Sequence, residues 1–225
     1  MPDSGTTSRA RLTRERVVAA AVSLADENGI ESLSMRGLAK AFGVEAMSLY
    51  HHVANREAVL DGMVDLVFSE IQVPEAHEDW QTAMRDRAHW ARAALTRHPW
   101  AVGLMDSRRS PGPATLRHYD AVLGCLRGGG LSLEMAGHAV AAIDAYVYGS
   151  VLQELSLPFE PGEEMEEMAV EVVEALPVDE YPHLIEFVRD RVLTAGYDFS
   201  DEFNYGLDLL LQGLMNASEG EPQSG

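Results

Sequence analysis

Apolar residues recur every three or four positions along most of the chain. No run shows the strict alternation of apolar and polar residues that is typical of a half-buried strand. The first clear stripe consists of Val18, Ala21, Val22 and Ala25, which would share one face of a helix. The pattern therefore predicts an all-α protein.

The first third of the chain predicts four helices, and residues at their ends support each one. Thr13, Ser34 and Asn55 each carry a side-chain oxygen that can accept a hydrogen bond from a free N–H in a first helical turn. Gly29 predicts a left-handed end to the first helix, and Pro74 stops the fourth. The predicted helices cover residues 14–29, 35–42, 45–51 and 56–73.

The rest of the chain predicts further helices of the same kind. Pro113 suits the first position of a helix, and Ser132 can cap a long apolar one. The acidic stretch from Glu160 to Glu167 predicts a mobile connection. The predicted helices cover residues 80–97, a short piece at 100–105, residues 113–128, a long segment from Ser132 past Val151, two segments flanking 177–179 with Gly196 closing the second, and a last helix from Ser200.

Charge divides the chain into two regions. Residues 1–56 hold seven Arg and Lys against six Asp and Glu, whereas residues 57–225 hold ten against thirty. Such an acidic remainder repels nucleic acid, so any contact with DNA is expected at the N-terminal end. Four arginines begin that end, and they could either neutralise phosphates or belong to a solvated tail. They are Arg9, Arg11, Arg14 and Arg16.

Composition narrows the class of protein. The chain has 225 residues, 46% hydrophobic and 24% charged, as expected for a soluble globular protein. Its single cysteine, Cys125, excludes an internal disulfide framework. No apolar stretch is long enough to span a membrane, and residues 1–7 lack the apolar core of a signal peptide. We therefore expect a cytoplasmic protein without membrane contact.

Two short helices joined at Gly43 have the outline of a helix-turn-helix, whose second helix lies in the major groove of DNA. Short polar groups on that helix can reach base edges, while larger ones can donate to phosphate oxygens. The alternative is an ordinary helical hairpin with a solvated surface. Packing would bury Leu38, Ala39, Phe42, Val44 and Leu49, and would leave Arg36, Ala46, Met47, Ser48, Tyr50, His51 and His52 outside.

The stretches LSMRGLAKAFGV and SLYHHVANREAVLDGM resemble the N-terminal domain of the tetracycline-repressor (TetR) family. DWQTAMRDRAHWARAALTRHPWA and DEFNYGLDLLLQGL are similar to the ligand-binding half of the tetracycline repressor's own subgroup. The resemblance implies a DNA-binding transcriptional regulator, most often a repressor released by a small molecule. The expected organisation is a flexible arm at 1–10, a helix-turn-helix domain at 11–56, a connecting helix at 57–74, a ligand-binding and dimerisation domain at 75–218, and a disordered tail at 219–225.

The resemblance also implies which residues face the double-stranded DNA operator. Arg36 could read a guanine, while hydroxyl groups and His52 would mainly hold phosphate. Ala46 and Met47 stand where the tetracycline repressor reads bases with an amide and a proline, so this operator must differ. The full expected set is Ser34, Arg36, Ala46, Met47, Ser48, Tyr50, His51, His52 and Arg56.

A homodimer and an effector pocket are further implications of the resemblance. The long helix around residues 140–151 and the last helix would pair with their twins as a four-helix bundle. Gly206 and Gly213 would let a second helix approach closely, or would simply belong to an internal core helix. Met105 stands where the tetracycline repressor has a histidine near magnesium, and a thioether suits that cation poorly, so we expect no metal and no cofactor. The expected ligand-binding residues are Gln72, Met84, Arg87, Trp90, Trp100, Met105, Tyr119, Ile143 and Tyr146.

Two other classes of protein compete with the regulator. An enzyme would need a catalytic motif, and the only candidate cluster, His118, Tyr119 and Asp120, is more simply a helical surface. The remaining histidines lack the spacing of a metal site, and we expect them to be structural or surface residues. An acidic helical dimer that binds another protein is the third possibility, and steeply salt-dependent DNA affinity would separate it from a regulator.

Overall fold

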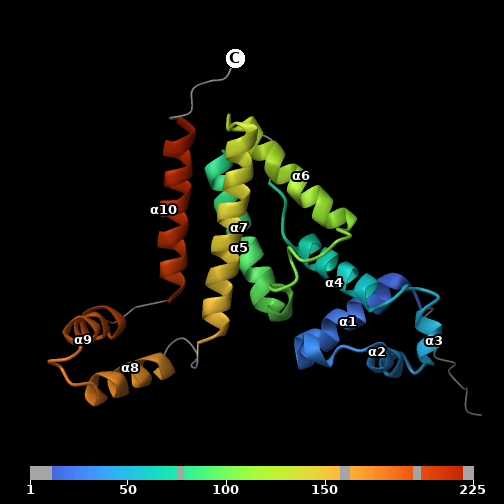
Figure 1. Ribbon diagram of the computed structural model, residues 1–225, viewed down its shortest axis with the longest axis horizontal. Coiled ribbons are helices and arrows are strands. Elements are labelled where there is room, and N and C mark those ends of the chain that lie inside the picture. The colour runs from blue at the N-terminus through green and yellow to red at the C-terminus, as the bar shows by residue number, and fades with distance from the viewer. Residues whose placement is uncertain (1–11, 75–78, 158–162, 195–198, 220–225) are drawn as a thin grey trace, which may run out of the picture. The chain divides into compact units, whose positions relative to one another are not determined.

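The computed structural model describes residues 12–74, 79–157, 163–194 and 199–219, and every regular element among them is helical (Figure 1). The predicted all-α fold is therefore confirmed. The predicted arm, the end of the predicted tail after Glu219 and the predicted helix end at Gly196 lie outside the described residues. The chain divides into two compact units, residues 1–128 and 129–225.

The first unit begins with three helices in the predicted helix-turn-helix region and continues through three longer helices. Thr13, Ser34 and Asn55 each cap a helix as predicted, because each side chain accepts a hydrogen bond from a first-turn N–H. The helices are α1 (Arg14–Asn28), α2 (Met35–Phe42), α3 (Ala46–Leu49), α4 (Arg56–Glu70), α5 (Trp80–Arg97) and α6 (Pro113–Gly128), with short 3-10 turns at Ile30–Ser32 and Pro99–Ala101.

α4 is the central helix of this unit, since it packs against α1, α5 and α6. Val59, Met63 and Val67 on α4 are fully buried, and so is Val17 on α1. Each such side chain contributes roughly 1.5–3 kcal/mol when it is removed from water. The helix that follows the predicted DNA-binding region is thus also part of the core that supports α6.

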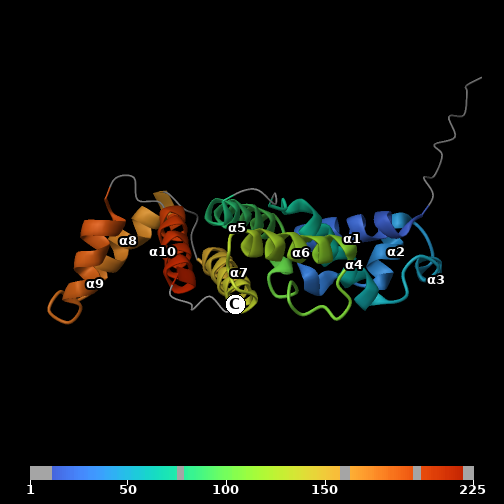
Figure 2. The ribbon, with the colours of Figure 1, turned by 90° about the horizontal axis from the view of Figure 1, so that it is seen from above.

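The second unit contains α7 (Leu133–Leu155), α8 (Glu163–Ala175), α9 (Pro182–Phe187) and α10 (Phe199–Glu219). A π-helical segment, Val188–Val192, continues α9. α7 and α10 lie side by side in both ribbon views (Figures 1 and 2). Ser132 caps α7 as predicted. None of the described helices is long and apolar enough to cross a membrane.

Contact between α7 and α10 depends on Gly206. A Cβ at this position would collide with the Tyr146 ring and hydroxyl group. That hydroxyl donates to the carbonyl oxygen of Phe203, 2.9 Å away, and the two rings stack with centroids 5.5 Å apart. This glycine therefore serves packing between α7 and α10 within the chain. No atom lies within 4 Å of a Cβ added at Gly213, so that position is open.

Four predicted details are wrong at helix ends. Residues 163–167 begin α8 instead of forming a connection, because their glutamates favour helix. The α-helical part of α3 covers only Ala46–Leu49, followed by a turn to His52. α4 ends at Glu70, where Ile71 becomes extended and buries its side chain. Gly29 has a φ of 76°, but its ψ of 158° lies outside the left-handed helical region.

Candidate DNA-binding surface and ligand cavity

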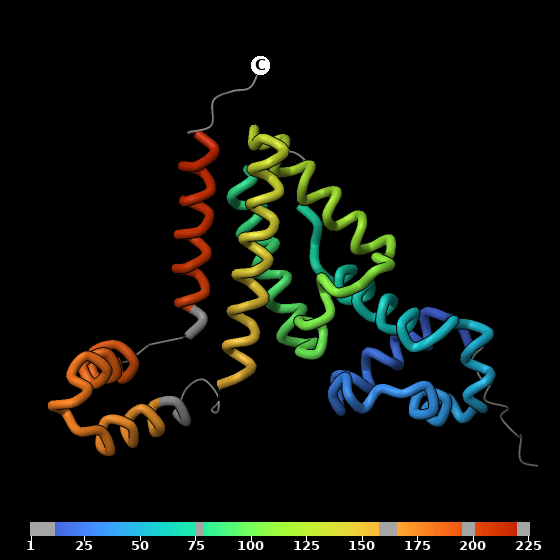
Figure 3. Tube along the Cα trace, in the orientation of Figure 1, coloured from blue at the N-terminus to red at the C-terminus, as the bar shows by residue number. Residues whose placement is uncertain are grey.

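α2 and α3 are joined by a tight turn at Gly43. This residue has a φ of 63° and a ψ of 37°, a left-handed conformation that glycine adopts without steric cost. Its N–H donates to the carbonyl oxygen of Lys40, and the following Val44 N–H donates to Ala39. Leu38 and Leu49 are buried where the two helices pack. The geometry is that of a helix-turn-helix, and Figure 3 traces its backbone.

The outer face of α3 and the turn after it carries the residues predicted to face DNA. Met47 is 72% exposed and Tyr50 is 44% exposed. His51 is also exposed, while Ala46, Ser48 and His52 are half-buried at the edges of this face. Leu49 alone points inward and is fully buried. The predicted hydroxyl and imidazole groups are therefore accessible to a partner.

Three further predicted residues lie at helix starts. Ser34 Oγ accepts a hydrogen bond from Gly37 N, and its own hydroxyl hydrogen remains able to donate. Arg36, the second residue of α2, is exposed. Arg56 differs, because its Nε donates to the Leu33 carbonyl oxygen at 3.3 Å. This bond joins the start of α4 to Leu33, which precedes the cap of α2, and so Arg56 also has a structural contact that sequence alone did not indicate.

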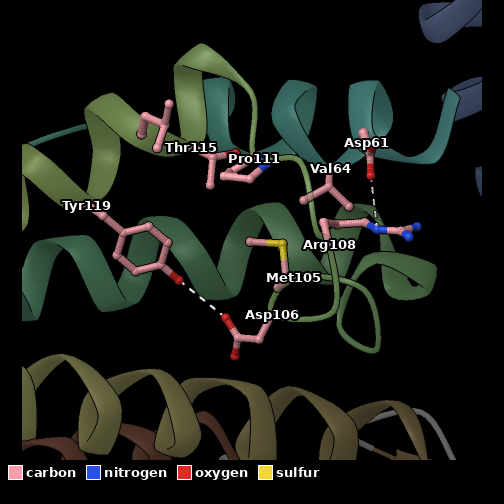
Figure 4. A pocket seen from close by; sticks show the side chains of 9 residues that line it. Asp61, Val64, Met105, Asp106, Arg108, Pro111, Thr115 and Tyr119 are labelled. Atoms are coloured by element: carbon pink, nitrogen blue, oxygen red, sulfur yellow. Dashed lines mark hydrogen bonds and ion pairs between the residues drawn. The ribbon is translucent and has the colours of Figure 1, made fainter. Parts of the chain in front are cut away.

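A cavity of about 270 Å³ lies between α4, the segment after α5 and the start of α6 (Figure 4). Its walls combine apolar side chains with two carboxylates, one guanidinium group and two hydroxyl groups. Of the nine residues predicted to bind a ligand, Met105 and Tyr119 line this cavity. The full lining is Asp61, Val64, Met105, Asp106, Arg108, Pro111, Thr115, Leu116 and Tyr119.

Three carboxylates one turn apart on α4 hold the other walls of this cavity in place. Glu57 Oε2 lies 2.6 Å from Arg108 Nη2, and Asp61 Oδ1 lies 3.2 Å from Arg108 Nε. Asp65 Oδ1 accepts hydrogen bonds from the backbone N–H and the hydroxyl group of Thr115, at 2.9 and 3.1 Å. A side chain of α4 thus caps α6. Gln72, one of the residues expected to bind a ligand, follows the end of α4, is exposed and does not line this cavity.

Arg87 and His118 form a buried polar pair beside this region. Arg87 is 2% exposed, and its Nε donates to His118 Nε2 at 2.9 Å. Burial, followed by the Arg87 charge, lowers the pKa of His118 to about 3. The neutral ring therefore carries its hydrogen on Nδ1, which has no hydrogen-bond partner among the described residues. Sequence reasoning missed this role, although His118 shares the buried face of α6 with Thr115, Val122 and Cys125.

Other predicted ligand-binding residues have different surroundings. Met84 is fully buried in α5, Trp90 is half-buried, and the Trp100 indole N–H donates to Asp26 Oδ1 at 2.6 Å. Ile143 and Tyr146 belong to the second compact unit, where Ile143 is buried and the Tyr146 hydroxyl bonds to α10.

A second polar cluster, also missed from sequence, joins α1, α4 and the end of α5. His98 is buried, with Nδ1 2.8 Å from Asp26 Oδ1 and Nε2 3.3 Å from Glu70 Oε1. Arg97 Nη2 lies 2.6 Å from Glu70 Oε2. Hydrogen bonds thus connect the first helix of the helix-turn-helix region to the segment that leads into the cavity. The described residues contain no group of His, Cys, Asp and Glu side chains suited to a metal ion.

The fold and these sites define a helix-turn-helix DNA-binding protein with a separate cavity. A family model described as bacterial regulatory proteins, tetR family, matches residues 17–63, and one described as tetracyclin repressor-like, C-terminal domain, matches residues 73–217. The chain belongs to the TetR family. It is accordingly a transcriptional regulator and not an enzyme.

Relatives and solved structures agree with this membership. An HTH-type transcriptional regulator of Saccharopolyspora erythraea is 36% identical over 68% of this chain and 65% of its own length, which is less than two thirds of that relative. The HTH-type transcriptional repressor DrrR1 of Streptomyces coeruleorubidus is 33% identical over 90% of this chain and 77% of its own length. The Streptomyces coelicolor TetR family protein ActR in complex with actinorhodin has a TM-score of 0.77 at 28% identity, covering 94% of this chain and all (100%) of that one.

Proposed function

We propose that this regulator is a ligand-responsive repressor that binds a near-palindromic DNA operator as a homodimer and leaves it when a small-molecule effector binds. The observation that carries the proposal is the outer face of α3, where Met47 and Tyr50 are exposed while Leu49 anchors the helix. In a helix-turn-helix, this second helix enters the major groove. DrrR1, whose name describes a repressor, supports the direction of control.

The proposed DNA contacts are of two kinds, contacts to base edges and contacts to backbone phosphates. Arg36 at the start of α2 reads a guanine, and Ala46 and Met47 offer apolar contact to a thymine methyl group. The phosphate holders donate from hydroxyl, imidazole and guanidinium groups. They are Ser34, Ser48, Tyr50, His51, His52 and Arg56.

Exposed apolar residues on α7 and α10 support a homodimer. Tyr205 and Leu209, one turn apart on α10, are 67% and 58% exposed, and Gly213 lies on the same face with open space above it. Leu152 and Leu155 near the end of α7 are also exposed. An apolar stripe of this kind is costly in water and is normally covered by a partner. A second copy would bury this stripe. It would also relate the two helix-turn-helix domains, here called the heads (residues 11–56), by a two-fold axis.

The cavity beside α4 is the proposed effector site. Three carboxylates of α4 hold its other walls, so a ligand that moves those walls also acts on the helix that follows the DNA-binding head. The ligand must prefer the released state, because equal affinity for both states shifts nothing. ActR has been solved with actinorhodin, which supports small-molecule binding by this fold. On this proposal residues 11–56 bind DNA, 57–74 connect and also line the effector site through Asp61 and Val64, and 75–218 bind ligand and dimerise.

Selection of bound fragments from a random DNA pool tests the proposal. We expect a near-palindrome with half-sites about one helical turn apart. Binding should weaken steeply as salt rises, because phosphate contacts release counterions. Arg36→Ala should lower affinity and relax preference at one base position, with Arg117→Ala, on the surface of α6, as the control. Selection of no sequence, or a monomeric mass in sedimentation at micromolar concentration, would contradict the proposal.

A further inference from the structure

The charged groups of the cavity do not balance one another. Arg108 supplies the only positive charge among the described lining residues, and two carboxylates of α4 already surround it. Glu57 makes the shorter contact, at 2.6 Å. The contact with Asp61 is poorer, because Arg108 Nε lies 3.2 Å from the carboxylate but makes no hydrogen bond. The guanidinium charge is therefore offset before any ligand enters.

Asp106 leaves a negative charge at the opposite wall of the cavity. Its Oδ1 accepts a hydrogen bond from the Tyr119 hydroxyl at 3.3 Å, and no cationic side chain among the described residues pairs with it. Figure 4 shows Asp106 and Asp61 on different walls, with Met105 between them. The cavity thus presents one carboxylate without a cation and a second whose cation is badly placed.

The remaining walls fit an apolar or aromatic body. Val64, Met105 and Leu116 supply aliphatic and thioether surface, and the Tyr119 ring can face a cation or an aromatic group. At about 270 Å³ the cavity lies just below the roughly 300–1,000 Å³ that is usual for drug-sized ligands, so it suits a small molecule.

We propose that the cavity binds a small organic cation, an amine with an apolar or aromatic body, whose ammonium group is held by Asp106. This inference rests on the proposed role of the cavity as the effector site. A carboxylate ligand would instead face Asp61 and Asp106 without a free cation to pair with.

Three compounds of equal length test the charge preference. They are 4-phenylbutylamine, 4-phenylbutan-1-ol and 4-phenylbutyrate, which are cationic, neutral and anionic at neutral pH. Titration calorimetry on the full-length protein should show the amine binding about tenfold more tightly than the alcohol, as one charge-assisted hydrogen bond allows, and no binding of the acid. Equal affinity for all three, tightest binding of the acid, or failure of the amine to bind at millimolar concentration would each overturn the proposal.

Variants then locate the ammonium group. Asp106→Asn keeps the shape and an acceptor for Tyr119 but removes the charge, so it should weaken the amine about tenfold and leave the alcohol unchanged. Asp120→Asn, an exposed position of α6 outside the cavity, should alter neither. If both variants weaken the amine equally, the amine is attracted by the overall negative charge of the protein and not by Asp106, and the proposed site is wrong.

An experiment can show that the cavity does not bind a cation without showing that the proposed repressor function is wrong, and the reverse is also true. Selection of an operator without any ligand tests DNA binding, and it does not depend on the charge of the effector. If an operator is selected but the amine shows no preference over the acid, only the present inference is wrong. If the amine binds through Asp106 and no DNA is selected, the cavity chemistry holds and the proposed repressor does not.

Discussion

The helix-turn-helix head and the cavity differ in how far apart in sequence their residues lie. The head gathers its predicted DNA contacts within residues 34–56, most of them on α3 and the turn after it, and the turn before α3 depends on one local glycine. The cavity brings α4 together with residues from 105 to 119, some 40 to 60 positions away. A local pattern therefore specifies the surface that meets DNA, whereas tertiary contacts between distant helices build the cavity.

The two regions also treat polar groups differently. On the head, Arg36, Tyr50 and His51 are exposed and available to a partner. In the body, which is the part of the first unit after residue 56, several polar side chains are instead buried and bonded to each other, as in the pair Arg87–His118 and the cluster around His98. Substitution of an exposed polar residue on the head should thus change DNA binding without changing stability, and substitution within a buried polar pair should change stability first. The following predictions test this difference.

The largest expected effect concerns His118. Its pKa of about 3 lies below the ordinary value of 6.5, so the unfolded chain binds more protons between these pH values. The contribution of His118 to stability is complete above pH 6.5 and is lost as pH falls, by about 1.4 kcal/mol per pH unit and roughly 4–5 kcal/mol in total. Denaturation from pH 8 to pH 4 should show a shallower loss in His118→Gln, which keeps an acceptor for Arg87. Parallel curves for the two proteins would refute the assignment.

Leu49→Ala should have the next largest effect, because it removes a fully buried side chain from the packing of α2 against α3. Such truncations cost about 2–5 kcal/mol. DNA binding should disappear although Leu49 touches no DNA in the proposed complex. The matched control is Met47→Ala, two positions away and 72% exposed, which should leave stability within about 0.5 kcal/mol and change only sequence preference. Thermal unfolding and operator binding measure the two effects.

These two substitutions show where sequence was sufficient. Leu49 was predicted to be inside and Met47 outside, because helical spacing and the Gly43 turn fix both locally. The caps at Thr13, Ser34 and Asn55 were also predictable, since each bonds to a residue three positions on.

Sequence was insufficient wherever the partner is distant. His118 gave no sign of Arg87, 31 positions earlier, and Gly206 gave no sign of Tyr146. Of the nine expected ligand-binding residues only two line the described cavity, because helical periodicity identifies the buried side of a helix but not the neighbour it meets. The charge pattern of the cavity likewise depends on which carboxylate of α4 lies beside Arg108.

Asp65→Ala tests the link between α4 and the body. It removes two hydrogen bonds to Thr115 and with them the cap of α6, at a cost of about 1–2 kcal/mol. Asp120→Ala, an exposed acid on α6 itself, is the control with the same change of charge and should cost little. Chemical denaturation measures both. Equal stability of the two variants would mean that Asp65 does not cap α6.

The smallest expected effect belongs to Tyr50→Phe on the head. The Tyr50 side chain is 44% exposed, so loss of its hydroxyl group should not alter the unfolding temperature. If that hydroxyl donates to a phosphate, operator affinity should fall by about 1 kcal/mol, or roughly fivefold. The loss should be the same on operator and on unrelated DNA, because a phosphate contact carries no sequence information. A loss confined to the operator would instead mean that Tyr50 contacts a base. A lowered unfolding temperature would mean that its hydroxyl group takes part in the packing of the head, and it would contradict the proposed difference between exposed polar groups on the head and buried ones in the body.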